Sequence, residues 1–174
     1  AAKLSRLYDG VFCLFPMEPP YFQREGMSAF FVGHPATITV ADTKGNLRKE
    51  LGIDKNKAVL GILFGSRLRE LHHIGPVIRK SILQTMKGKR DEFEIVTLTL
   101  PHLEKHVRNL CHGLPCKVHV VSDRSQKWAA FNTMDFAVAT SGTVGLELSL
   151  AKVPHIIAYK ANALTAAIVR RQLK

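Results

Sequence analysis

The sequence predicts an α/β protein built on a parallel sheet flanked by helices, and two observations lead to this class. Short runs rich in β-branched residues alternate with longer amphipathic segments, which is the pattern of βα units around a parallel sheet. Hydrophobic residues make up 46% of the 174 residues and charged residues 22%, which is typical of a globular chain with an apolar core. This length is enough for one domain of ordinary size and part of a neighbour.

Seven short apolar runs have the length and composition of strands. They lie at residues 10–14, 29–32, 58–64, 94–100, 117–121, 136–140 and 154–159. The segments between them predict helices at residues 18–25, 68–86, 101–112, 124–133, 143–151 and 163–173. Pro101 suits a helix start, where its missing N–H is not needed, and Thr143 is a small polar residue able to cap the helix that follows.

Residues 33–46 contain turn formers and small polar residues without a strong period, as an interdomain linker does. We therefore assign residues 1–35 to the end of a first Rossmann-like domain, 36–57 to a linker with a helix, and 58–174 to a second Rossmann-like domain. Ligands of such sheets bind outside the carboxyl ends of the strands, so the loops that leave strands are the places to search for a site.

The net charge of +11, from 25 Lys and Arg against 14 Asp and Glu, favours anionic partners such as nucleotide phosphates or a membrane surface. The basic residues are dispersed and no RNA-binding motif accompanies them, so we expect no nucleic-acid partner.

The longest apolar stretches have strand length and fall well short of the roughly 20 residues that span a bilayer. The chain is expected to be cytoplasmic.

A metal site is not expected. Cys111, His112, Cys116 and His119 lie close together along the chain, but their spacing matches no common zinc pattern. The adjacent residues His72 and His73 point about 100° apart on a helix, so they are better interpreted as helix-surface residues than as ligands of one ion.

The loop that leaves strand 58–64 is the first candidate phosphate site. Gly65 permits close approach of the backbone, Ser66 can hydrogen-bond a phosphate oxygen, and Arg67 offers a planar guanidinium suited to a diphosphate. The same three residues also fit a simple helix entry with a surface arginine.

The second candidate is Ser141-Gly142-Thr143, which follows strand 136–140 and precedes a helix. Free N–H groups at a helix start and the two hydroxyls suit an anion, and Glu147 lies where its carboxylate could accept hydrogen bonds from ribose hydroxyls. A capped helix with a glutamate near its N-terminus is the alternative. The residues taken by themselves indicate a phosphate-binding α/β domain.

Five motifs, in order and spacing, resemble those of lipid A disaccharide synthases. They are LFPME at 14–18, FVGHP at 31–35, GSR at 65–67 followed by Glu70, SGT at 141–143 followed by Leu146 and Glu147, and Ala158-Tyr159. The resemblance extends over essentially the whole chain. It implies a GT-B glycosyltransferase, with two Rossmann-like domains and the donor nucleotide held mainly by the second.

Such an enzyme transfers 2,3-diacylglucosamine from UDP-2,3-diacylglucosamine to 2,3-diacylglucosamine 1-phosphate, giving a β-1,6-linked disaccharide and UDP. The resemblance implies an inverting reaction that needs no metal and no cofactor, at the cytoplasmic face of the inner membrane. The protein would then be peripheral on that anionic surface.

Carried onto this sequence, the resemblance assigns UDP binding to eight residues: Gly65, Ser66, Arg67, Glu70, Ser141, Gly142, Thr143 and Glu147. Glu18 and His34 are further candidates for a cleft between the domains. Two residues depart from the family pattern. Phe64 stands where the family usually has proline, and Arg69 replaces a small residue, so the loop at 65–67 is expected to differ in shape.

By the same resemblance, the chain is expected to begin inside the first domain and to end before the last segment of the second. The acceptor pocket and the general base would then lie in the missing N-terminal part, and this chain alone would not catalyse the transfer. Two other functions fit the same residues. One is another UDP-sugar protein of GT-B type, an N-acetylglucosamine transferase or a 2-epimerase, and the other is a nucleotide-binding module without catalytic activity.

Overall fold

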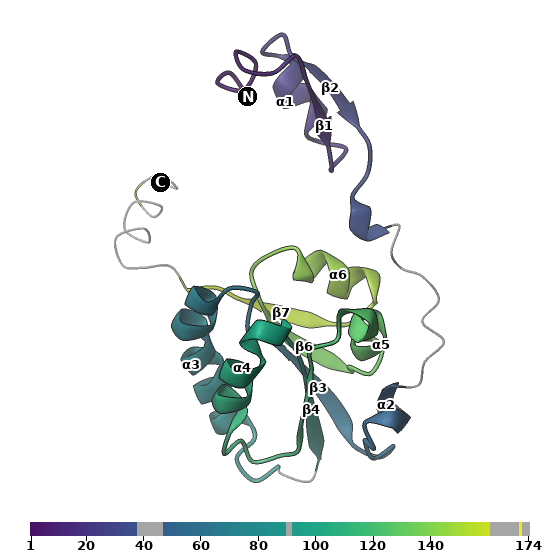
Figure 1. The fold of residues 1–174 in the computed structure, drawn as a ribbon, viewed down its shortest axis with the longest axis vertical. Coiled ribbons are helices and arrows are strands. Elements are labelled where there is room, and N and C mark those ends of the chain that lie inside the picture. Colours follow the sequence, from purple (N-terminus) through teal and green to yellow (C-terminus); the bar gives the residue numbers. More distant parts are fainter. Residues whose placement is uncertain (38–46, 90–91, 161–170, 172–174) are drawn as a thin grey trace. The chain divides into compact units, whose positions relative to one another are not determined.

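The computed structural model describes residues 1–37, 47–89, 92–160 and 171 (Figure 1). The chain divides into two compact units, Ala1–Asp42 and Thr43–Lys174. The boundary between them falls within the segment that we assign to the linker. The helix expected at 163–173 lies outside the described residues, apart from residue 171.

The first unit is a small βαβ arrangement. Strands β1 (Gly10–Cys13) and β2 (Ser28–Phe31) pair in parallel, and the short helix α1 (Pro19–Gln23) connects them. Side chains on one side of this pair are buried, with Cys13 2% and Ala29 5% exposed. The expected helix at 18–25 is shorter than predicted, and it starts at a proline, which needs no N–H partner there.

The second unit contains a five-stranded parallel sheet. Its strands are β3 (Ala58–Leu63), β4 (Phe93–Leu98), β5 (Val118–Val121), β6 (Phe136–Thr140) and β7 (His155–Ala158). They lie in the order β5-β4-β3-β6-β7, and all four pairings are parallel. All seven predicted strands are therefore confirmed, two in the first unit and five in the second.

The strand order reverses direction at β3, because the chain builds outward through β4 to β5 and then returns to place β6 on the other side of β3. The loops that follow β3 and β6 consequently leave in opposite directions from adjacent strands. Such a switch point opens a crevice at the carboxyl end of a doubly wound sheet, which is where these folds bind ligands.

Helices cover both faces of this sheet. They are α2 (Leu47–Glu50), α3 (Leu68–Thr85), α4 (Glu104–Cys111), α5 (Lys127–Phe131) and α6 (Val144–Leu150). The helices expected from 101 and 124 begin instead as 3-10 turns, Pro101–Leu103 and Arg124–Gln126. The prediction that Thr143 caps α6 is wrong in one respect: Thr143 occupies the N-cap position, but its helical backbone conformation leaves its side chain without a capping hydrogen bond.

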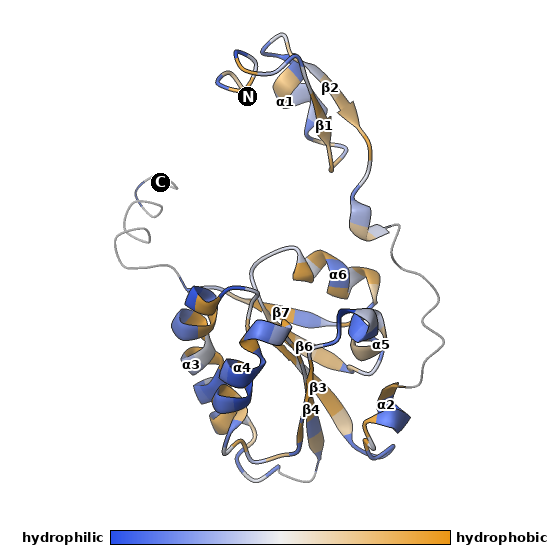
Figure 2. Ribbon diagram, in the orientation of Figure 1, coloured by the Kyte–Doolittle hydropathy of each residue, from blue (hydrophilic) through white to orange (hydrophobic). Residues whose placement is uncertain are grey.

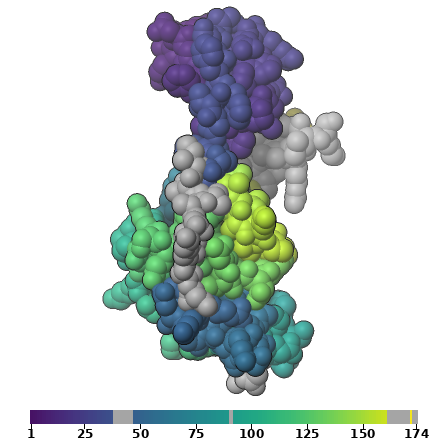
Figure 3. Space-filling view, turned by 90° about the vertical axis from the view of Figure 1, so that its right-hand side faces the viewer, coloured from purple at the N-terminus to yellow at the C-terminus, as the bar shows by residue number. Residues whose placement is uncertain are grey.

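Alternation along β3 divides the core into two layers. Leu60, Ile62 and Phe64 face the layer under α3 and α4, whereas Val59 and Leu63 face the layer under α2, α5 and α6. Figure 2 shows the apolar residues concentrated on the central strands, while α4 is mostly hydrophilic. Figure 3 looks onto the side of the second unit that carries α2, α5 and α6. Burial on both faces explains why the strands appear as continuous apolar runs.

No helix in the described part of the chain combines the length and apolar character needed to cross a bilayer. The longest of them, α3, has 18 residues and presents Leu71, Ile74 and Ile78 to the core while its other face is polar.

Candidate functional site

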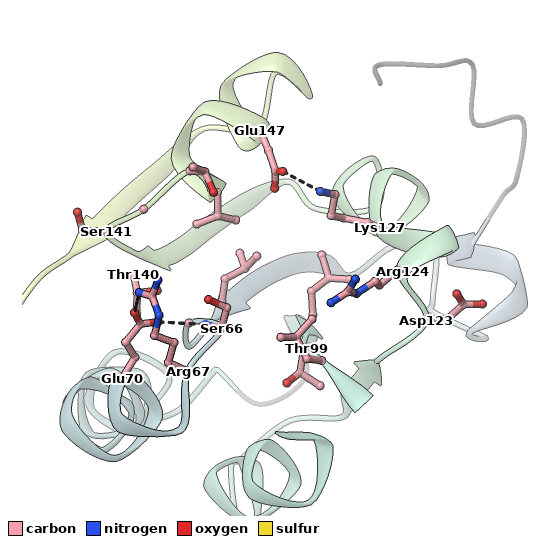
Figure 4. Close-up of a pocket in the computed structure, with 17 residues that line it drawn as sticks. Ser66, Arg67, Glu70, Thr99, Asp123, Arg124, Lys127, Thr140, Ser141 and Glu147 are labelled. Atoms are coloured by element: carbon pink, nitrogen blue, oxygen red, sulfur yellow. Dashed lines mark hydrogen bonds and ion pairs between the residues drawn. The ribbon is translucent and has the colours of Figure 1, made fainter. Parts of the chain in front are cut away.

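A pocket of about 570 Å³ opens at the carboxyl ends of β3, β4, β5 and β6, all within the second unit (Figure 4). The residues that line it come from the four loops that follow those strands and from the first turns of the helices beyond them. They are Leu63, Gly65, Ser66, Arg67, Glu70, Leu98, Thr99, Leu100, Asp123, Arg124, Lys127, Thr140, Ser141, Gly142, Thr143, Val144 and Glu147.

All eight residues that we predict to bind UDP line this one pocket. Ser66 and Ser141, which represent the two predicted loops, are 75 positions apart in sequence. They meet because β3 and β6 are neighbours in a parallel sheet, which places their carboxyl ends side by side.

The loop after β3 is held in shape by Glu70. One carboxylate oxygen of Glu70 accepts a hydrogen bond from the Ser66 amide at 3.1 Å, and the other accepts from Arg67 at 2.8 Å. Gly65 has a φ of +106°, and a Cβ at this position would lie 2.5 Å from the same carboxylate. The glycine is thus required by both backbone conformation and space.

These contacts define the structural role of Glu70. Its carboxylate is negative, and it already accepts hydrogen bonds from two donors that would suit an anion, Ser66 and Arg67. Glu70 therefore braces the loop rather than offering a donor to a phosphate. The side chain of Arg67 is 78% exposed, and an exposed ion pair of this kind is worth only about 0 to 1 kcal/mol, so Arg67 can exchange Glu70 for an incoming anion.

The loop after β6 forms the opposite wall. Thr140 is buried at 7% exposure, and the next three residues, Ser141 to Thr143, are exposed to the pocket. Glu147 lies one turn into α6, and its Oε1 accepts a hydrogen bond from Nζ of Lys127 at 2.7 Å. The Glu147 side chain is 18% exposed, so this is a half-buried carboxylate with a direct cationic partner.

The polar pocket residues that the sequence did not predict include Thr99 after β4, and Asp123, Arg124 and Lys127 after β5. The Oγ1 of Thr99 is buried and has no hydrogen-bond partner among the described residues. Arg124 points into the pocket (Figure 4), and no ion pair joins it to any carboxylate in the described part of the chain. Their only sequence signal is their position directly after strands.

The pocket contains both signs of charge. Arg67, Arg124 and Lys127 are its cations, and Asp123 and Glu147 are acids beside them, together with Glu70. Asp123 is occupied locally, because its carboxylate accepts from the hydroxyl and amide of Ser125 at 2.7 and 2.8 Å. The hydrogen bond from the Ser125 hydroxyl makes the largest contribution, and the bond from the Ser125 amide adds to it. Together they hold the pKa of Asp123 below its ordinary value.

Glu18 and His34 do not line this pocket and belong to the first unit. Oε2 of Glu18 accepts from the amides of Leu14 and Phe15, both at 2.9 Å, and Nδ1 of His34 accepts from the amide of Ala36 at 3.1 Å. Both side chains hold local turns. Their assignment to a cleft between domains stays a prediction.

The two departures from the family pattern have different surroundings. Phe64 is 1% exposed and packs in the core layer under α3 and α4, whereas Arg69 is exposed and lies outside the pocket lining.

His119 is turned into the interior against Glu94. Within the described ranges, no three His, Cys, Asp or Glu side chains gather closely enough to hold a metal ion.

The sheet order and the pocket together define a class: a doubly wound Rossmann-like domain with a charged pocket at its topological switch point. The family model for lipid-A-disaccharide synthetase matches residues 1–174, so the chain belongs to that family.

Curated relatives carry the same description. The lipid-A-disaccharide synthase of Rhodopseudomonas palustris (strain BisB18) is 38% identical over 99% of this chain, and that of Rhodospirillum centenum is 32% identical over all of it. The chain spans 44% of the length of each of these relatives.

Solved structures share the fold at low sequence identity. The S. aureus MnaA–UDP co-structure matches 95% of this chain and 47% of its own with a TM-score of 0.68 at 13% identity. UDP-GlcNAc 2-epimerase from Methanocaldococcus jannaschii, in complex with UDP-GlcNAc and UDP, matches 87% of this chain and 46% of its own with a TM-score of 0.59 at 15% identity. The GT-B type of fold is thereby confirmed, and the family match favours a lipid A synthase over an epimerase.

Proposed function

We propose that this chain provides the donor-binding part of a glycosyltransferase of lipid A biosynthesis, and that the UDP of UDP-2,3-diacylglucosamine binds in the pocket of the second unit. The observation that carries the proposal is the meeting of Arg67, the Ser141–Thr143 loop and Glu147 around one pocket at the switch point. Membership of the lipid-A-disaccharide synthetase family supports the identity of the reaction.

The diphosphate is placed between the two loops that face each other across β3 and β6. Arg67 leaves Glu70 to form a bidentate contact with a phosphate, which is the geometry that a guanidinium favours. The hydroxyls of Ser141 and Thr143 supply further donors on the opposite side. Gly142 has nothing within 4 Å of the place where a Cβ would be, which leaves room for a phosphate oxygen beside the backbone.

The ribose is placed on Glu147. A carboxylate accepts hydrogen bonds from two vicinal hydroxyls, and Glu147 already has one oxygen oriented by Lys127. Because Glu147 lies in α6 and Arg67 directly precedes α3, the ribose would lie toward α5 and α6 and the diphosphate toward α3.

The proposed reaction is an inverting transfer that needs no metal. The 6-hydroxyl of 2,3-diacylglucosamine 1-phosphate attacks the anomeric carbon of the donor, the new C–O bond forms as the bond to the diphosphate oxygen breaks, and a general base outside this chain takes the hydroxyl proton. Negative charge grows on the departing UDP, so Arg67 and the Ser141–Thr143 loop lower the barrier by stabilising that charge.

The anionic surface of the inner membrane is the proposed location of the intact protein, on its cytoplasmic face, because both substrates are lipids. The net charge of +11 supports such peripheral binding, since each Lys or Arg near an anionic surface contributes about 1 kcal/mol. Cosedimentation with vesicles of anionic and of neutral phospholipid tests it, and equal binding to both would contradict it.

Titration calorimetry with UDP tests the nucleotide site. Arg67→Ala removes the diphosphate contact and Glu147→Ala the ribose contact, and each loss of a charge-assisted hydrogen bond is expected to weaken UDP binding about tenfold or more. Arg69→Ala is the matched control, because Arg69 is an exposed arginine two positions after Arg67 and lies outside the pocket lining. Unchanged UDP affinity in both site variants would refute the assignment.

A further inference from the structure

We infer that Lys127 is a positioning residue that orients Glu147 for the ribose and makes a carboxylate tolerable beside the diphosphate. The inference rests on the proposed binding of UDP in this pocket. Nothing in the sequence sets Lys127 apart from the other lysines, and only the structure places it at the site.

The contact joins two separate elements. Lys127 is the first residue of α5, which follows β5, and Glu147 lies in α6, which follows β6. In the sheet, β5 and β6 are separated by β4 and β3, so the pair bridges the switch point above the strands (Figure 4). The helices that carry the pair pack on the same core layer, through Phe131 and Leu148.

Lys127 is itself held in place. Its ammonium lies 5.7 Å from the centre of the Trp128 ring, and that ring is 8% exposed and meets Phe131 edge-on at 5.6 Å. The Nζ of Lys127 lies 2.7 Å from Oε1 of Glu147. An ammonium over an aromatic face and against a carboxylate loses much of its freedom, so the carboxylate that it contacts is fixed as well.

Two consequences follow for a ligand. First, Lys127 holds Oε1 of Glu147, which leaves the other oxygen as the acceptor that a ribose hydroxyl would meet. Second, the positive charge of Lys127 is next to the negative charge of Glu147, so the pair is close to neutral toward a diphosphate. An unpaired carboxylate in the same place would repel the diphosphate.

The role of Lys127 therefore differs from that of Arg67. The side chain of Arg67 is mostly exposed and can turn to a phosphate. Lys127 instead forms an ion pair with Glu147, whose side chain is 18% exposed. A direct phosphate ligand contributes to the binding of any diphosphate. A residue that acts through Glu147 contributes mainly where the ligand has ribose hydroxyls, and the repulsion of a diphosphate by an unpaired Glu147 is the smaller effect.

The test compares three probes by calorimetry on the full chain: UDP, 2′,3′-dideoxy-UDP and pyrophosphate. Lys127→Met is expected to weaken UDP binding about tenfold while it changes dideoxy-UDP and pyrophosphate binding less than threefold. Lys127→Arg restores most of the UDP affinity because it keeps a cationic donor. Lys105→Met, an exposed lysine of α4 outside the pocket, is the control for loss of charge.

A double-variant comparison provides the second measurement. In a Glu147→Gln background, Lys127→Met is expected to give no further loss of UDP affinity, because its effect passes through the carboxylate. Lys127→Ala, which also removes the donor and the charge, replaces the methionine variant if the latter does not fold by circular dichroism.

The outcomes separate the two ideas. Absence of UDP binding to the unchanged chain refutes the proposed function and, with it, the inference. If the unchanged chain binds UDP, the inference alone is overturned by equal losses for all three probes, which would make Lys127 a phosphate ligand. It is also overturned by a lower melting temperature with unchanged UDP affinity, which would make the pair a purely structural link between α5 and α6.

Discussion

The Nε2 of His119 lies 2.6 Å from Oε2 of Glu94, so two ionisable side chains meet in the interior between the neighbouring strands β5 and β4. Their side chains are 7% and 4% exposed. Glu94 is the second residue of β4, and the pocket opens at the other end of that strand. The pair is therefore a stability feature whose effect can be measured apart from ligand binding.

The stability of the chain is expected to fall in acid because of Glu94. Burial alone raises the pKa of this carboxyl, but hydrogen bonds from His119 and from the Asp54 amide, with the charges of His119 and Lys117, bring it below its ordinary value of 4.5. A carboxyl with a lowered pKa in the folded state stabilises that state above pH 4.5 and loses the effect as the pH drops through the folded value.

Urea unfolding at several pH values between 7 and 3 measures this effect. The free energy of unfolding should decline below pH 4.5, and Glu94→Gln should reduce the slope of that decline because the amide does not titrate. The same slope in both proteins would show that other carboxyl groups cause the acid sensitivity.

Gly65→Ala is expected to cost more stability than a glycine substitution elsewhere with a similar backbone conformation. At Gly65 a Cβ has both an unfavourable φ of +106° and a contact of 2.5 Å with Glu70. At Gly88 the φ is +83° with nothing within 4 Å, so Gly88→Ala bears only the backbone strain, about 1 to 3 kcal/mol. Denaturant unfolding compares the two.

Binding should separate the same two variants. Moving Glu70 disturbs the Ser66 amide and Arg67, so Gly65→Ala is expected to lower UDP affinity, while Gly88→Ala, remote from the pocket, leaves it unchanged. Wild-type affinity in Gly65→Ala would mean that the loop binds no part of the ligand.

Arg124→Ala is expected to weaken the binding of both UDP and pyrophosphate. Its guanidinium points into the pocket without a carboxylate partner among the described residues, so its charge is available to an anion. The loss should be several-fold at low ionic strength and smaller at 0.5 M salt, because salt screens an exposed charge. Calorimetry with pyrophosphate checks it, and a loss restricted to UDP would place Arg124 on the nucleoside instead.

Local patterns were sufficient for most of the secondary structure. The run of β-branched and small apolar residues at 136–140 predicts the bounds of β6 correctly, and the long amphipathic segment at 68–86 matches α3 to within one residue. The short helices were less accurate. Arg124 begins a 3-10 turn in which the Asp123 side chain accepts from the Ser125 amide, a contact that periodicity does not show.

For the pocket, too, local sequence patterns predict some of the residues and not others. Gly65 to Arg67 and Ser141 to Glu147 were found because a glycine and small polar residues directly after a buried strand are a local signal. Thr99, Arg124 and Lys127 carry no such signal, since a lysine or arginine at a helix start is ordinarily in solvent. They enter the pocket only because β4 lies beside β3 and β5 lies beside β4 in the sheet.

The sequence alone determined the α/β class, the seven strands and the two loops around Ser66 and Ser141. Hydrophobic periodicity and turn chemistry depend on residues that are neighbours in the chain, so they can be read without the tertiary structure. The tertiary structure decided the strand order β5-β4-β3-β6-β7, which gathers four loops around one pocket, and the contact between Lys127 and Glu147. These are decided by which apolar faces pack together, and that packing joins residues far apart in the chain.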